Sequence, residues 1–218
     1  GQLLAELLAI LCGVGLIIGA LSVTGLSGTL VNELLFLAGD DTAVLLLTGA
    51  LTSFLLGIGL TVTAAYVFLA IVLAPALLGG GLDPLAVHLF ILYWGMLSFI
   101  TPPVALGAFA AASIAGSRPV KTGFEAMRLG LATYLIPFLF VLNPALIGHS
   151  SAMAAFQAVV EALFGVYLIA CAAQRYLPVV GEIPLLLTIP VGLSGCLVAL
   201  PGLDIIQLDW SNTQGNTL

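Results

Sequence analysis

Long apolar runs separated by short polar turns dominate this chain, and they predict helices. The runs cover residues 3–24, 44–78, 84–116, 125–148, 152–172 and 183–203. A helix needs about twenty apolar residues to cross a bilayer, and the period-two alternation typical of a half-buried strand is missing. We therefore predict an all-α membrane protein that crosses the membrane several times. Whether the last run spans the membrane or lies at its surface stays open, because prolines interrupt it.

Residues 44–78 are too short for two spans and are interrupted in their middle. Two apolar arms of about a dozen residues each flank a tip rich in glycine and threonine, whereas a complete crossing needs about twenty residues. A re-entrant hairpin, which enters and leaves the membrane on one side, fits this pattern. Gly57 and Gly59 allow positive φ at the tip, and Thr61 and Thr63 bring hydroxyl groups there. The alternative is one long helix kinked at its glycines.

A second interruption falls inside residues 84–116, where Thr101, Pro102 and Pro103 lie near the middle of the run. Each proline removes a backbone donor and clashes with a carbonyl one turn earlier, so a continuous helix cannot pass. The flanks are too apolar for a solvated loop, which puts the break at membrane depth. Non-helical backbone survives there only inside protein or beside a wet cavity, and broken helices host the sites of many secondary transporters.

The two helix ends at this break predict a site for an ion and a site for an anion. We expect unpaired carbonyls around residues 97–100 to suit a cation, and free N–H groups around Ala105 to suit a carboxylate. Ser98 and Thr101 add side-chain oxygens. Oxygen donors without a cluster of carboxylates favour a weakly bound alkali ion such as Na⁺ over Ca²⁺ or a transition metal.

Composition and charge support the membrane assignment and give it an orientation. The chain is 61% hydrophobic and 6% charged, whereas about a quarter of the residues of a soluble domain are charged. Arg118, Lys121 and Arg128 cluster in one connection and Arg175 lies in another, so the positive-inside rule makes both connections cytoplasmic. The net charge of −6 gives no basic face for nucleic acid. The three cysteines lie in apolar runs and are expected to act as small hydrophobes.

Several ionisable residues lie in or beside the predicted spans. Glu161 falls in the middle of residues 152–172, and a lone carboxylate inside a membrane is a functional candidate. His88 lies one turn from the start of its helix, where an interfacial histidine is favoured over a ligand. Glu125 and Arg128 are three residues apart and are expected to pair.

Four stretches of the chain together resemble the large membrane subunit of TRAP transporters. They are CGVGLIIGALSVTGLSGTL at 12–30, LLGIGLTVTAAYVFLAIVLAPAL at 55–77, DPLAVHLFILYWGMLSFITPPVALGAFAAASIAG at 83–116 and GFEAMRLGLATYLIPFLFVLNPALI at 123–147. The resemblance covers residues 3–148 and is nearest to the form in which the large and small membrane subunits are fused.

This resemblance implies an elevator-type secondary transporter with two inverted repeats, each containing a re-entrant hairpin and a broken helix. In such a transporter, Na⁺ drives the uptake of a carboxylate solute that a periplasmic solute-binding protein delivers. The implied location is the cytoplasmic (inner) membrane of a bacterium or archaeon. The other implied partners are the small membrane subunit or the amino-terminal half of the same transporter, and the lipid bilayer. No cofactor besides the coupling ion Na⁺ is implied.

The chain resembles the second repeat only, so we expect it to be a piece of a longer transporter. Residues 1–148 form the expected transport unit, with spans at 3–24 and 125–148, the hairpin at 44–78 and the broken helix at 84–116. Residues 149–218 are expected to supply additional transmembrane segments and a polar tail.

The match and the helix ends at the break together give the candidate site residues. The Na⁺-binding candidates are Gly57, Gly59, Thr63, Ser98, Thr101 and Pro102. The solute-binding candidates are Thr61, Thr63, Thr101, Pro103, Val104 and Ala105. The family often has proline and threonine at the positions where this chain has Thr61 and Val62.

Two other classes of function compete with a transporter. A membrane scaffold or interaction subunit without an ion site would use its glycines and prolines for packing alone. An intramembrane enzyme is disfavoured, because the sequence contains no His-Glu-x-x-His motif, no Gly-x-Ser-x-Gly motif and no paired intramembrane aspartates. We therefore expect no catalytic residues and no resident metal.

Overall fold

The computed structural model describes residues 41–58, 60–178 and 180–200, together with scattered positions between residues 5 and 37. The predicted span over 3–24 lies largely outside these residues, and the polar tail lies wholly outside them. The described part is helical apart from one two-stranded sheet. The all-α fold class is therefore confirmed.

Two helical arms occupy the region of the predicted hairpin. The first arm is α3 (Thr42–Gly57), and the second is α4 (Val62–Val72) followed by the short α5 (Ala74–Gly79). The Asp41 carboxylate accepts hydrogen bonds from two N–H groups at the start of α3, and the Thr61 hydroxyl accepts one at the start of α4. These caps satisfy groups that have no acceptor within their helices.

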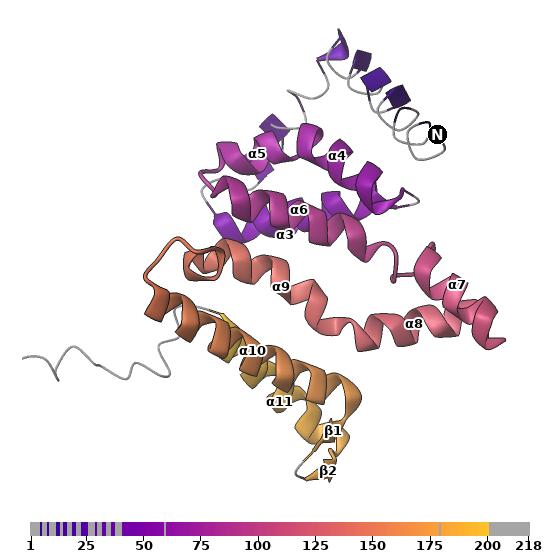
Figure 1. The fold of residues 1–218 in the computed structure, drawn as a ribbon, viewed down its shortest axis with the longest axis vertical. Coiled ribbons are helices and arrows are strands. Elements are labelled where there is room, and N and C mark those ends of the chain that lie inside the picture. The colour runs from indigo at the N-terminus through magenta and orange to yellow at the C-terminus, as the bar shows by residue number, and fades with distance from the viewer. Residues whose placement is uncertain are drawn as a thin grey trace, which may run out of the picture.

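Helix α6 (Pro84–Leu97) is the central element of the fold. Helices α4 and α5 lie on one side of it and α9 (Leu131–Leu142) lies on the other (Figure 1), and α3 also packs against it. The core joins α6 to both arms of the hairpin and includes Leu46, Leu69, Leu73, Leu77, Val87, Phe90 and Ile91. Between helices in lipid, such packing stabilises mainly through dispersion contacts, because lipid tails are as apolar as the side chains.

The helix that contains the two prolines is interrupted. Helix α6 ends at Leu97, α7 (Leu106–Ala115) follows, and residues 98–105 between them form turns rather than α-helix. We call residues 98–105 the helix break. Its position agrees with the steric effect of two successive prolines.

The connection predicted around Arg118, Lys121 and Arg128 is largely helical instead. Helix α8 (Pro119–Leu129) begins with a proline in its first turn, a position that proline tolerates because its missing N–H would be unpaired there. Helix α8 meets α9 at Gly130 with a bend of 43°. The segment predicted as one span over 125–148 is therefore part of a bent pair, which the 3₁₀ helix η1 (Pro144–Ile147) follows.

Two antiparallel helices form the C-terminal end of the described chain. Helix α10 (Ala152–Gln174) and α11 (Leu185–Ala199) are joined by strands β1 (Tyr176–Leu177) and β2 (Gly181–Glu182). Within the described residues, only α10 is long and apolar enough to span a membrane as a single helix, and the bent α8–α9 pair passes the same test jointly.

Candidate functional site

The C-terminal ends of α3 and α6 meet beside the helix break. A Cβ atom on Gly57 would lie 2.7 Å from the carbonyl oxygen of Gly95, so the two backbones approach more closely than any side chain allows. The Ser98 hydroxyl is 3% exposed and donates a hydrogen bond to the Gly57 carbonyl, at 3.0 Å. The Gly95 carbonyl also lies 3.0 Å from this hydroxyl. The structure thus brings together the predicted site residues Gly57 and Ser98.

Thr101 is buried inside the break and bonds to two different helices. Its hydroxyl donates to the Leu97 carbonyl at 2.7 Å and is also hydrogen-bonded to the hydroxyl of Tyr134, from α9. A threonine hydroxyl has one proton and two lone pairs. Because that proton is used on Leu97, Tyr134 is the donor of the second bond. Thr101 therefore keeps one free lone pair.

More of the backbone N–H and carbonyl groups of the break are hydrogen-bonded than we predicted. The Leu97 carbonyl accepts from the N–H of Ile100, and the Phe99 carbonyl accepts from the N–H of Gly107. The Ala105 N–H donates to the Thr101 carbonyl, at 3.2 Å. The expectation of unpaired groups at residues 97, 99 and 105 was therefore wrong, because the prolines produce a tight turn that forms its own hydrogen bonds.

Ala105 joins the break to α7 in an unusual backbone conformation. Its φ of 35° and ψ of 47° lie in the left-handed region, and its side chain is completely buried. A non-glycine residue in a sparsely populated region costs on the order of 1–3 kcal/mol, and such residues cluster at functional sites. The surrounding packing holds Ala105 at the start of α7, where the first N–H groups of the helix lack intrahelical acceptors.

Helix α8 packs against the break. A Cβ atom on Gly123 would lie 2.7 Å from Cγ of Pro102, so α8 lies directly against the proline pair. The Pro102–Pro103 peptide bond is cis. Pro103 is exposed and Val104 is half-buried. Of these predicted site residues, Pro102 packs against protein and Pro103 faces outward.

The threonines of the hairpin tip are exposed. Thr61 Oγ1 accepts from the N–H of Ala64 as the cap of α4, and Thr63 lies in the first turn of that helix. Gly59 lies outside the described residues. Across the described part of the chain, no hydrogen bond joins Thr61 or Thr63 to Thr101. The link between tip and break is the bond between Ser98 and Gly57.

Sequence reasoning missed Tyr134, which is the partner of Thr101 on α9. Its ring packs edge to face against Trp94, with centroids 5.9 Å apart, and Phe138 packs against the same indole at 5.8 Å. The spacing of the aromatic residues in the sequence could have indicated this contact. Tyr134 and Phe138 lie one helical turn apart, as do Phe90 and Trp94, which predicts two aromatic faces that can pack together.

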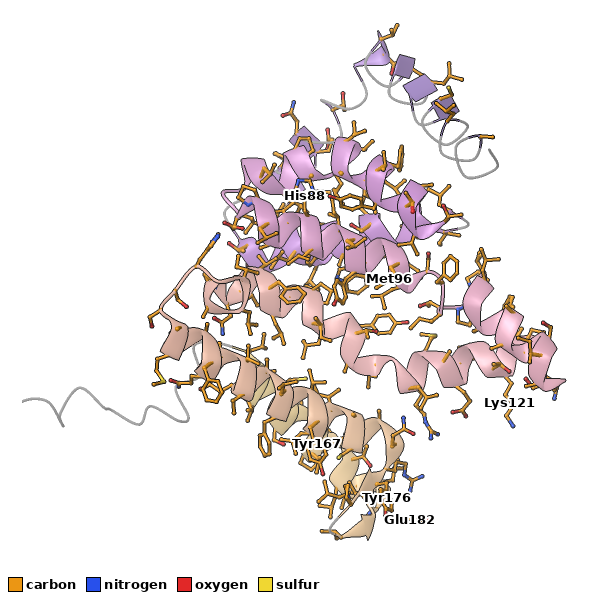
Figure 2. The ribbon with its side chains drawn as sticks, viewed as in Figure 1. His88, Met96, Lys121, Tyr167, Tyr176 and Glu182 are labelled. Carbon is orange, nitrogen blue, oxygen red and sulfur yellow. The ribbon has the colours of Figure 1, made fainter. Side chains whose placement is uncertain are left out.

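The remaining candidates have ordinary partners. Glu161 accepts a hydrogen bond from Gln157 one turn earlier on α10, and His88 Nδ1 lies 3.2 Å from the Tyr66 hydroxyl. Figure 2 shows His88 between α4 and α6, and Lys121 on α8 pointing away from the body of the molecule. The predicted pairing of Glu125 with Arg128 is present at 3.6 Å. The described residues contain no cluster of metal-ligating side chains.

The part of the chain that forms the hairpin, the break, α8 and α9 also matches a known family. The model of that family, described as tripartite ATP-independent periplasmic transporter, DctM component, matches residues 1–155. No curated protein and no solved structure gives a significant match. The family match covers most of the chain, and it agrees with the apolar helices of the fold. The chain therefore belongs to the DctM family, the large membrane component of TRAP transporters.

Proposed function

We propose that this chain is the C-terminal half of a Na⁺-coupled secondary transporter that imports carboxylate solutes by an elevator mechanism. Its DctM membership makes it a component of a TRAP transporter. The observation that carries the proposal is the hydrogen bond from Ser98 to the Gly57 carbonyl, because it joins the hairpin tip to the helix break. Broken helices and their exposed ends are the usual hosts of coupling ions and solutes in such transporters.

The ion site in this proposal is formed by neutral oxygens. The Gly57 carbonyl and the hydroxyls of Ser98 and Thr101 lie at buried residues. Each hydroxyl keeps a lone pair beyond its hydrogen bonds, whereas the Gly57 carbonyl accepts from both Ser98 and the Leu60 N–H and would exchange one of these bonds for the cation. A hard alkali cation prefers such oxygens. Gly59, Thr63 and Pro102 complete the set of candidates.

The solute site in this proposal faces the start of α7. The N-terminus of a helix carries partial positive charge and N–H groups without intrahelical acceptors, which favour a carboxylate. In α7 the Gly107 N–H is already used on the Phe99 carbonyl, which leaves its neighbours in the first turn. Pro103, Val104 and Ala105 lead into this end of α7. The exposed Thr61 and Thr63 supply hydroxyl groups from the hairpin tip.

The packing of the hairpin supports movement as one unit. Helices α3, α4, α5 and α6 share a single hydrophobic core, so they are suited to move together in an elevator step. We propose that the hairpin enters and leaves the membrane on one side. The proposed partners are a periplasmic solute-binding protein, the small membrane subunit or the amino-terminal half of the transporter, and the lipids of the cytoplasmic membrane of a bacterium or archaeon.

The proposal predicts that Thr101→Val abolishes Na⁺-dependent uptake. The substitution keeps the shape of the side chain and removes the hydroxyl that bonds to Leu97 and Tyr134. Uptake of radiolabelled mono- and dicarboxylates into proteoliposomes holding the whole transporter is measured with a Na⁺ gradient and with a K⁺ gradient. Normal Na⁺-dependent uptake by this variant would contradict the assignment.

Thr48→Val is the matched control. Thr48 lies on α3, and its hydroxyl bonds only to carbonyls of its own helix, those of Val44 and Leu45. Uptake by this variant is expected to stay within about twofold of the wild type, since surface and peripheral changes cost about 0.5 kcal/mol or less. Equal thermal stability of the wild type in Na⁺ and in K⁺ would instead favour a scaffold without an ion site.

A further inference from the structure

We propose that Tyr134 is a positioning residue that holds the Thr101 hydroxyl in the orientation required for binding the coupling ion. The inference rests on the function proposed above and adds a residue from α9, outside both the hairpin and the broken helix. Three features support it: the direction of the hydrogen bonds, the way Tyr134 is held in place, and the position of α9 against the break.

The hydrogen bonds leave the Thr101 oxygen with a single free direction. Its proton is donated to the Leu97 carbonyl, and one of its lone pairs accepts from Tyr134. The second lone pair is the only hydrogen-bonding position left on this oxygen. Without the tyrosine hydroxyl, either lone pair could face the cation or turn away from it. Tyr134 therefore removes an alternative orientation of the ligand.

The position of Tyr134 is itself fixed by aromatic packing. Its ring lies edge to face on Trp94, at 73° and 5.9 Å, and Trp94 makes a second edge contact with Phe138. Aromatic pairs of this kind add stabilisation beyond the burial of their surface area. The phenol is thus held by contacts that do not involve its hydroxyl, so Tyr134→Phe removes the hydrogen bond and keeps the packing.

The start of α9 is also held against the break. A Cβ atom on Gly130, where α8 bends into α9, would lie 2.8 Å from Cδ1 of Ile100. Tyr134 lies one helical turn after Gly130, which places its hydroxyl beside the neighbouring residue of the break, Thr101. The bond between Tyr134 and Thr101 thus depends on how α9 sits against the break.

The test is Tyr134→Phe in the whole transporter, assayed in proteoliposomes. The Na⁺ concentration for half-maximal uptake is expected to rise about three- to tenfold, the effect of losing one hydrogen bond of about 1 kcal/mol. The KM for the carboxylate at saturating Na⁺ is expected to stay unchanged. The melting temperature in K⁺ is expected to fall slightly, because the lost hydrogen bond also contributes to stability. An unchanged Na⁺ requirement would overturn the inference, and so would an equal rise in the solute KM.

Tyr93→Phe is the matched control, because Tyr93 also packs across the α6–α9 interface, 5.6 Å from Phe140, and does not bond to Thr101. Its Na⁺ requirement is expected to match the wild type. A rise equal to that of Tyr134→Phe would assign the effect to the interface in general and overturn the inference.

A double-mutant cycle with Thr101→Val tests whether Tyr134 acts through Thr101. The readout is the rise in melting temperature on replacing K⁺ with Na⁺, which reports ion binding without uptake. We expect Tyr134→Phe to reduce this rise in the wild type and to have no further effect after Thr101→Val. An equal reduction in both backgrounds would overturn the inference. A wild type that Na⁺ does not stabilise, and whose uptake does not depend on Na⁺, would instead refute the proposed function.

Discussion

Close contacts between glycines occur both near the helix break and between α10 and α11, and they have different consequences in the two regions. In both regions glycine lets two backbones approach closely: Gly57 meets Gly95 near the break, and Gly165 meets Gly195 between α10 and α11. Near the break, this approach brings a carbonyl within reach of the buried Ser98 hydroxyl. Between α10 and α11 it brings together two antiparallel helices whose outer surfaces are apolar.

The difference indicates where the function of the chain resides. The family match ends at residue 155, just after α10 begins, so it includes the break and excludes most of the C-terminal pair. Large exposed side chains such as Phe156, Leu163, Leu186 and Ile189 cover α10 and α11. An apolar surface of this size suits contact with lipid or with other membrane segments. Close glycine packing alone is therefore no sign of a binding site in this protein.

The largest effect is expected from Gly57→Val. A Cβ at this position meets the Gly95 carbonyl at 2.7 Å, and backbone cannot move aside as a flexible side chain can. Overpacking of this kind costs about 1–3 kcal/mol, and here it also separates the Gly57 carbonyl from Ser98. We expect uptake and the stabilisation by Na⁺ both to be lost. Gly192→Ala is the control, because its Cβ would meet Ala172 at 3.4 Å, an ordinary contact.

Retention of Na⁺ stabilisation by Gly57→Val would contradict the distinction between these two regions. It would mean that the close approach near the break serves packing alone, as it does between α10 and α11. Both variants are extracted from the membrane fraction and checked for a single peak in size-exclusion chromatography in detergent, so that loss of function is not confused with loss of folded protein.

The interruptions of the helices could be predicted from local sequence, whereas the bonds across them could not. Two successive prolines in the interior of an apolar run, at 102–103, prevent a continuous helix, so the break follows from backbone sterics alone. At the hairpin tip, α3 ends at Gly57, which does not adopt the positive φ that the sequence allowed for. The bonds from Ser98 to Gly57 and from Tyr134 to Thr101 join residues 41 and 33 positions apart. Such pairs depend on how the helices pack, which no local pattern specifies.

The path of the chain after the break likewise could not be predicted fully from local sequence. The basic residues at 118–128 predicted a connection, because charge marks a segment at the membrane surface but does not distinguish a loop from a helix lying there. The structure forms α8 in this segment and packs Gly123 on Pro102. That contact requires the chain to turn back after α7, and Gly116, whose φ of 63° is left-handed, lies at this turn.

A smaller and different effect is expected from Gly165→Val on α10. Its Cβ would lie 2.6 Å from the Gly195 carbonyl, so the substitution forces α10 and α11 apart and costs about 1–3 kcal/mol. We expect a lower melting temperature in both Na⁺ and K⁺, with an unchanged Na⁺ concentration for half-maximal uptake. A change in the Na⁺ requirement would show that the C-terminal pair is coupled to the ion site, and the division between the two regions would fail.

The smallest effect is expected from Glu161→Gln. The carboxylate of Glu161 lies on α10 and accepts a hydrogen bond from Gln157, and glutamine offers a carbonyl oxygen of nearly the same shape to this donor. Uptake and its Na⁺ dependence are expected to stay within about twofold of the wild type, since changes away from buried networks cost about 0.5 kcal/mol or less. Both are measured in proteoliposomes beside Thr101→Val. A loss of uptake comparable to that of Thr101→Val would make Glu161 part of the transport mechanism, because only its charge has been removed. The lone carboxylate in α10 would then be a functional group rather than a helix side chain with a local partner.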